Sequence, residues 1–172
     1  MRKHIRRAFR TLLKIALIFA AVCILFNMVF RLIYVDGESM MPTLENGDWI
    51  AACRPAHVDR GEIVLTNTDN AHHARLIKRV IAFGGETVDI DYDTGTVFIN
   101  GTALEEPYLA DKTIAGGDVT FPLTVPQGCV FLLGDNRVNS VDSRYSEIGC
   151  VPQSDLIGPV VIRLLPAPAR PL

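Results

Sequence analysis

The chain divides into two parts with different hydrophobic patterns. Residues 15–30 contain no charged side chain, and the apolar run extends over residues 12–35 if Lys14 and Arg31 snorkel towards the membrane surfaces. A run of this length is sufficient to cross a bilayer core, which requires about 20 residues. The pattern predicts a transmembrane helix over residues 12–35, preceded by a basic tail over residues 1–11.

Two alternatives compete with a membrane anchor, namely a cleavable secretory signal and a buried core helix. A secretory signal has a shorter apolar stretch followed by small residues at its cleavage site, whereas Arg31 and the apolar run Leu-Ile-Tyr-Val follow here. A core helix would be amphipathic, but this segment is apolar on all sides apart from Asn27. We therefore favour the anchor.

After residue 35 the pattern changes to short β-type runs separated by turn signals. Pairs such as Asn46-Gly47, Gly84-Gly85 and Asn100-Gly101 are typical of tight turns. We therefore expect a mainly β fold, with a single domain of short, mostly antiparallel strands over residues 36–165 and an extended Pro-rich tail over residues 166–172. The expected strands cover residues 49–52, 62–65, 76–81, 87–90, 96–99, 129–133 and 160–164.

The charges are distributed unevenly between the two parts. Residues 1–34 hold seven of the 17 Lys and Arg residues and none of the 19 acids. Because six of these bases precede residue 15, the positive-inside rule predicts a single-pass protein of the plasma membrane with a cytoplasmic N-terminus and an extracytoplasmic domain. The rest of the chain carries a net charge of −9, which argues against a nucleic-acid partner. Membrane lipid is the expected contact, with Trp49 either touching the bilayer or lying in the core.

Cysteines and histidines give no support for a metal or cofactor, and we expect neither. The four cysteines have no CxxC or zinc-like spacing. His57, His72 and His73 show no paired-ligand spacing, and a Ser-His-Asp triad has no positive evidence. Cys129 and Cys150 either form a disulfide in an oxidising compartment or remain as buried free thiols, which we favour.

Lysine is scarce in the domain, which contains only Lys78 and Lys112. Strand alternation over residues 76–81 places Lys78 on one face and Arg79 on the other, and both faces are otherwise apolar. One of these two basic side chains must therefore lie among hydrophobic neighbours. Desolvation lowers the pKa of a buried lysine by up to several units from about 10.4, and a neutral amine is a general base that activates a serine without histidine. A solvated lysine on an edge strand is the alternative.

Two further segments concentrate residues that are able to do chemistry. Residues 37–44 place Ser39 in a turn between Gly37 and Pro42, which exposes its hydroxyl and backbone N–H. Residues 134–144 contain two each of Asp, Asn, Arg and Ser, enough for a dense hydrogen-bond network. On physical grounds alone, Ser39 is a turn residue and the second segment is a loop held by its own side chains.

Together these segments closely resemble the type I signal peptidases, membrane-anchored serine proteases that remove signal peptides from exported proteins. The resemblance is carried by Ser-Met-x-Pro-Thr-Leu after the apolar run, Gly47-Asp48, Lys78-Arg79 followed by Gly84-Gly85, and Gly-Asp-Asn-Arg-x-x-Ser-x-Asp-Ser-Arg. The four segments occur in the family's order and cover most of the domain. The resemblance also implies a mostly β fold.

The resemblance implies a role for each matching residue. Ser39 corresponds to the nucleophile and Lys78 to its general base. Ser140 corresponds to a serine that hydrogen-bonds the lysine amine. Met40 is similar to a residue that contributes to the substrate pocket and desolvates the lysine. The remaining matches are ion pairs, Asp142 with Arg144 near the site and Asp135 with Arg79.

The reaction that the resemblance implies is acyl transfer. The serine attacks the scissile carbonyl, and the lysine takes its proton, returns it to the leaving amine and then activates water. The expected substrate is an extended signal peptide with small residues at the first and third positions before the cut, bound as an added strand. The Ser39 N–H would stabilise the oxyanion. One branch of the family has a serine two positions before the nucleophile as a second donor, but this chain has Gly37.

Three other functions remain open. A dedicated Ser-Lys protease would process one or few secreted partners, such as pilins. A self-cleaving repressor-like protein is disfavoured by the anchor and by the absence of a DNA-binding half. A non-catalytic anchored domain would bind secreted peptides without cutting them, and the intact Ser39, Lys78 and Ser140 count against it.

Overall fold

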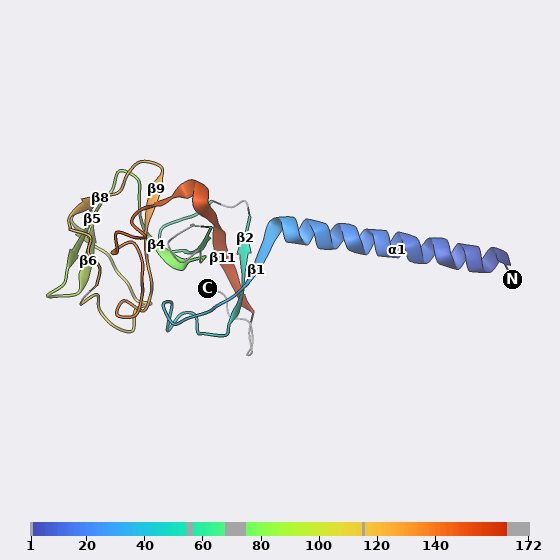
Figure 1. Cartoon of the computed structure of the whole chain (residues 1–172), viewed down its shortest axis with the longest axis horizontal. Coiled ribbons are helices and arrows are strands. Elements are labelled where there is room, and N and C mark those ends of the chain that lie inside the picture. Colours follow the sequence, from blue (N-terminus) through green and yellow to red (C-terminus); the bar gives the residue numbers. More distant parts are fainter. Residues whose placement is uncertain (1, 55–56, 68–74, 115, 165–172) are drawn as a thin grey trace.

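The computed structural model describes residues 2–54, 57–67, 75–114 and 116–164 of the chain. These residues form one long helix followed by a domain of short antiparallel strands, which confirms the mainly β class. The helix α1 (Arg2–Val29) projects away from the domain, with the N-terminus at its far end (Figure 1). The predicted Pro-rich tail over residues 166–172 and the histidines His72 and His73 lie outside the described residues.

The helix ends at Val29, before the boundary predicted at residue 35. Residues Phe30–Tyr34 instead form strand β1, which pairs antiparallel with β2 (Trp49–Cys53). An apolar strand next to an apolar helix shows no change in composition, so only its pairing with β2 reveals the boundary. The segment Phe9–Val29 is still long and apolar enough to cross a membrane, since its 21 residues span about 30 Å as a helix.

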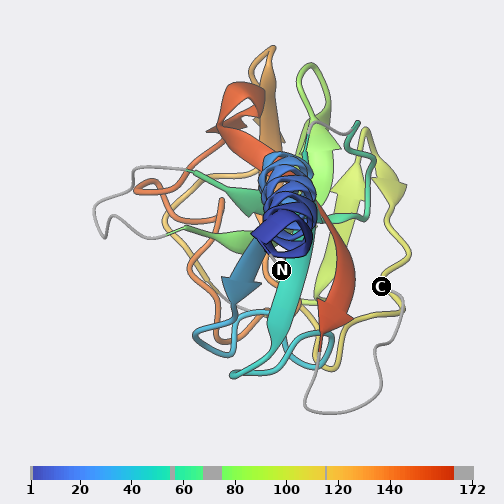
Figure 2. The ribbon, with the colours of Figure 1, turned by 90° about the vertical axis from the view of Figure 1, so that its right-hand side faces the viewer.

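The larger sheet contains the strands that carry the site. Its order is β1-β2-β11-β3-β4-β9-β10, and all neighbouring strands are antiparallel. The sheet curls strongly, since residues of β1 and β4 line one cleft although three strands separate them in the sheet order (Figure 2). The further strands are β3 (Ile63–Thr66), β4 (Ile77–Phe83), β9 (Cys129–Leu133), β10 (Val151–Pro152) and β11 (Leu156–Leu164), which follows the 3-10 turn Gln153–Asp155.

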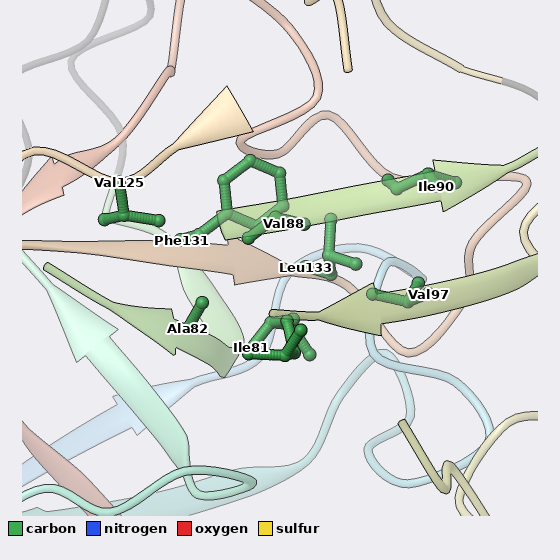
Figure 3. Packing of buried hydrophobic residues seen from close by; sticks show 9 residues of the cluster. Ile81, Ala82, Val88, Ile90, Val97, Val125, Phe131 and Leu133 are labelled. Atoms are coloured by element: carbon green, nitrogen blue, oxygen red, sulfur yellow. The ribbon is translucent and has the colours of Figure 1, made fainter. Parts of the chain in front are cut away.

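A smaller sheet of order β7-β6-β5-β8 lies at the end of the domain opposite α1 (Figure 1). A hydrophobic core joins it to strands β4 and β9 of the larger sheet, with Phe131 and Ile81 fully buried in the cluster (Figure 3). Burial of this apolar surface fixes β4 and β9 in place. The strands of the smaller sheet are β5 (Thr87–Asp91), β6 (Thr96–Ile99), β7 (Thr102–Ala103) and β8 (Leu123–Thr124).

Cys129 and Cys150 are free thiols that pack against the edge of this core. Cys129 begins β9, and Cys150 immediately precedes β10, its partner strand. Burial raises the pKa of the Cys150 thiol to about 11, so this thiol stays protonated at neutral pH. Both thiols are therefore free, as expected, but they are partly buried and not fully buried.

Candidate active site

Ser39 lies in the loop between β1 and β2, above a second hydrophobic cluster that includes Met40 and Leu44. The loop turns at Gly37, whose φ of 115° is strained for any residue with a side chain. The Gly37 N–H donates to Asn46 Oδ1 at 3.0 Å. A serine at this position would therefore be strained in the present loop conformation.

Lys78 and Arg79 are both buried, with exposed fractions of 4% and 8%. The sequence required only one of them to lie among apolar neighbours, but β4 runs between β3 and β9 and both of its faces are covered. The Lys78 Nζ donates a hydrogen bond to Ser39 Oγ at 2.7 Å. The structure therefore brings together a serine hydroxyl and a lysine amine that are 39 residues apart in the chain.

Burial lowers the pKa of Lys78 from 10.5 to about 8. Removal of the amine from water disfavours its charged form and is the largest cause. The nearby Asp142 opposes this by stabilising the ammonium, and Arg144 acts in the same direction as burial. Near pH 7 a fraction of the Lys78 side chains is consequently neutral. The neutral amine is the form that is able to accept a proton.

Arg79 connects three separate segments of the domain. Its guanidinium donates to both carboxylate oxygens of Asp135, at 2.8 and 2.5 Å. The Thr43 hydroxyl donates to the same carboxylate at 2.5 Å, which ties the loop that carries Ser39 to the loop after β9. The guanidinium carbon also lies 3.9 Å from the centre of the Tyr108 ring. Arg79 and Asp135 therefore form a bidentate ion pair.

Asp142 and Arg144 form a second ion pair, and both side chains are fully buried. The guanidinium donates to the two carboxylate oxygens at 2.8 and 3.0 Å. Asp142 also accepts a hydrogen bond from the Gly134 N–H at 3.0 Å, and Arg144 donates to the Ser140 carbonyl at 3.3 Å. Buried charges are tolerated when they are paired and further hydrogen-bonded in this way.

Ser140 differs from the expectation. Its Oγ is buried and makes no hydrogen bond to any described residue, so the bond to the Lys78 amine that the resemblance implies is not formed here. Its backbone carbonyl is held by Arg144, and its side chain lines the same cleft as Lys78. Met40 is 1% exposed and lines this cleft beside Ser39.

The cleft around Ser39 has two lobes that share five lining residues, Asp36, Gly37, Ser39, Leu76 and Lys78. The anchor-side lobe has a volume of about 800 Å³, is bounded mainly by residues 32–37 and 75–78, and has a wall of mixed apolar and polar side chains. The loop-side lobe has a volume of about 640 Å³. Its further lining comes mainly from Glu38, Val138, Asn139, Ser140, Val141 and Tyr145. An extended chain crossing both lobes would pass the hydroxyl–amine pair.

Several residues that hold the site were not assigned roles from the sequence. The Asn136 N–H donates to the Ser39 carbonyl at 3.0 Å, which fixes the loop that carries Ser39. Arg137 is fully buried and bonds Thr113 at 2.5 Å and Glu106 at 3.1 Å, outside its own loop. The dense polar composition of residues 134–144 was the available signal, but long-range partners are not encoded in local spacing.

Comparisons with known proteins agree with this geometry. The family model described as signal peptidase, peptidase S26 matches residues 8–165. The chain belongs to the signal peptidase family S26. It is 35% identical to a signal peptidase I of Bacillus amyloliquefaciens, over 77% of this chain and 72% of that protein. It is also 37% identical to signal peptidase I S of Bacillus subtilis, over 69% of this chain and 68% of the relative.

A solved structure of the S26 family supports the same conclusion at the level of the fold. The crystal structure of a signal peptidase I from Enterococcus faecalis superposes with a TM-score of 0.51 at 35% sequence identity. The match covers 60% of this chain and 97% of that protein. The resemblance inferred from the sequence motifs is therefore confirmed.

Proposed function

We propose that this chain is a membrane-anchored serine endopeptidase that cleaves N-terminal signal peptides from exported preproteins, with Ser39 as nucleophile and Lys78 as general base. The 2.7 Å contact between Ser39 Oγ and the Lys78 amine carries the proposal. The lysine is buried and its pKa is lowered to about 8, as a proton acceptor near neutral pH requires. Membership of the signal peptidase family supports the substrate class.

The reaction proceeds by acyl transfer. Ser39 Oγ attacks the scissile carbonyl while the Lys78 amine takes the hydroxyl proton. The resulting ammonium protonates the leaving amine, and the neutral lysine then removes a proton from the water that hydrolyses the acyl-enzyme. Asp142 lowers the cost of the transient ammonium, since its charge favours the protonated form.

Two groups at the site are available for the charges that develop during this reaction. The Ser39 N–H donates no hydrogen bond to a described residue and is free to stabilise the oxyanion. The buried Ser140 Oγ likewise has no described partner and lines the cleft beside Lys78. Once the amine is protonated, this hydroxyl accepts a hydrogen bond from it and orients it, which is a positioning role.

The signal peptide binds in the anchor-side lobe as an extended segment between residues 32–37 and 75–78. Backbone groups on either side add it as a strand, and the walls of the lobe select small residues at the first and third positions before the cut. Met40 is buried at this wall and helps to keep water from the amine.

The domain meets the outer surface of the membrane on the side where α1 leaves it. Trp49 is 48% exposed, so the alternative of a core tryptophan is wrong. Trp49 packs against Tyr34 of β1, with ring centres 5.7 Å apart. Leu32, also in β1, is exposed as well. Aromatic rings of this kind suit the lipid headgroup region. The basic start of α1 then lies in the cytoplasm and the catalytic domain outside it.

The test is incubation of the purified full chain with a preprotein, followed by sequencing of the new N-terminus. Ser39→Ala and Lys78→Ala should each abolish cleavage while the far-UV circular dichroism stays unchanged, because the two groups act as a unit. Lys112→Ala, which changes the exposed lysine of the domain, serves as the matched control. Full activity in either site variant would contradict the assignment. Binding without cleavage by the wild type would indicate a non-catalytic peptide-binding domain instead.

A further inference from the structure

The loop-side lobe of the cleft has an acidic rim that the proposed reaction does not use. Asp36 and Glu38 both line this lobe and are exposed. Neither carboxylate makes an ion pair with a described residue. The other charged residue of the lobe is Lys78, so the two carboxylates outnumber the single amine even when that amine is protonated. The lobe therefore presents a negative potential to any chain that leaves the nucleophile in this direction.

The Glu38 carboxylate is held in position next to the nucleophile. The Glu38 carbonyl accepts hydrogen bonds from Met41 N–H and from the Asn136 side chain, both at 3.1 Å. Its carboxylate accepts a hydrogen bond from Asn139 Nδ2 at 3.3 Å, across the mouth of the lobe. The anchored backbone and this bond from Asn139 keep the charge of Glu38 near the path of the substrate.

The position of the anchor sets the direction in which a substrate lies. The apolar segment of a signal peptide stays in the membrane, and the anchor-side lobe adjoins the strand that continues α1. Residues before the scissile bond consequently occupy the anchor-side lobe. Residues after the bond, which begin the mature protein, leave through the loop-side lobe past Glu38, with Asp36 at the boundary between the two lobes.

We infer that Glu38 and Asp36 make the enzyme select by charge at the first residues of the mature protein, favouring basic side chains and disfavouring acidic ones. The inference rests on the proposed function and adds to it a specificity on the far side of the cut. The aliphatic stems of Lys and Arg also suit Val138 and Val141, which are 62% and 45% exposed at the same rim.

The test uses peptides that share one signal sequence and differ only in the first two mature residues, which are Lys, Gln or Glu. The full chain in detergent should cleave the Lys peptide about three- to tenfold more efficiently, by kcat/KM, than the Glu peptide at low salt. The preference should shrink at high salt because both carboxylates are exposed. The ratio between peptides cancels any loss of activity common to both.

The double variant Asp36→Asn and Glu38→Gln should bring this ratio close to one. The control Asp93→Asn and Glu105→Gln removes the same charge at exposed positions that do not line the cleft, and it should keep the wild-type ratio. A wild type that cuts all three peptides equally, or a double variant that keeps the preference, overturns the charge selection but leaves the protease assignment intact. A wild type that cuts none of them overturns both.

Discussion

Replacement of Lys78 by Met is expected to abolish cleavage and, at the same time, to stabilise the fold. The folded chain holds the Lys78 amine in a buried position where its pKa falls from 10.5 to about 8. One pKa unit corresponds to about 1.4 kcal/mol, so retention of the ammonium form in the folded chain costs about 3 kcal/mol. Methionine fills a similar volume without charge, at the loss of one hydrogen bond to Ser39. The expected net gain at neutral pH is about 1–3 kcal/mol.

The pH dependence of this gain follows from the direction of the pKa shift. Between the folded pKa of about 8 and the unfolded value of 10.5, the unfolded chain binds more protons than the folded chain. The unfolding free energy of the wild type therefore rises with pH across this window. The advantage of Lys78→Met is consequently full below the folded pKa and disappears above the unfolded one.

Urea unfolding of the full chain in mild detergent, followed by far-UV circular dichroism, measures the effect at neutral and at alkaline pH. Lys112→Met changes an exposed lysine and should leave the unfolding free energy unchanged at neutral and at alkaline pH. An unfolding free energy for Lys78→Met equal to or below that of the wild type at neutral pH would refute the reasoning. A gain that persists unchanged at alkaline pH would show that it does not come from the buried charge.

Three further predictions concern activity and membrane contact. The kcat/KM for a neutral peptide should rise about tenfold per pH unit below the Lys78 pKa of about 8 and level off above it, and a flat profile from neutral to acidic pH would contradict a lysine base. Gly134→Ala should lower kcat more than tenfold, because an added Cβ would collide with Ser140 Oγ and lie 2.5 Å from the Ser39 carbonyl oxygen, so that the loop around Ser39 must shift. The control is Gly84→Ala, whose added Cβ would meet backbone atoms of Pro126 and Gln127 instead, and a kcat of Gly134→Ala equal to that of the wild type would disprove the displacement. Trp49→Ala should weaken the partitioning of residues 30–172 into lipid vesicles several-fold, while Val161→Ala at another exposed apolar position should not; unchanged partitioning of Trp49→Ala would exclude this residue from the membrane contact.

Much of the fold was predictable because turn signals and β-type runs alternate clearly after residue 35. The predicted strands at residues 96–99 and 129–133 match the observed bounds. The strand β1 was missed because its composition continues that of the helix, and only its register with β2 distinguishes it. The two-residue strands β7, β8 and β10 are too short for any periodicity to reveal them.

The candidate site was predictable only where the local sequence pattern indicates which side chains are buried. The alternation around Lys78 showed that a charged side chain had to be covered, and the family motifs supplied the partner Ser39. The contact of Arg137 with Glu106 and the missing bond of Ser140 depend on how separate loops meet. Distances of that kind are set by tertiary packing, which no local pattern encodes.

The absence of any spacer between α1 and β1 has a mechanical consequence. The helix ends at Val29 and the paired strand begins at Phe30, while the Arg54 N–H donates to the Val29 carbonyl at 2.6 Å. The domain is thus joined directly to α1, with no linker between them to act as a hinge. The Ser39–Lys78 site is therefore held at a fixed distance from the lipid surface. This distance determines how far from the bilayer a substrate is cut.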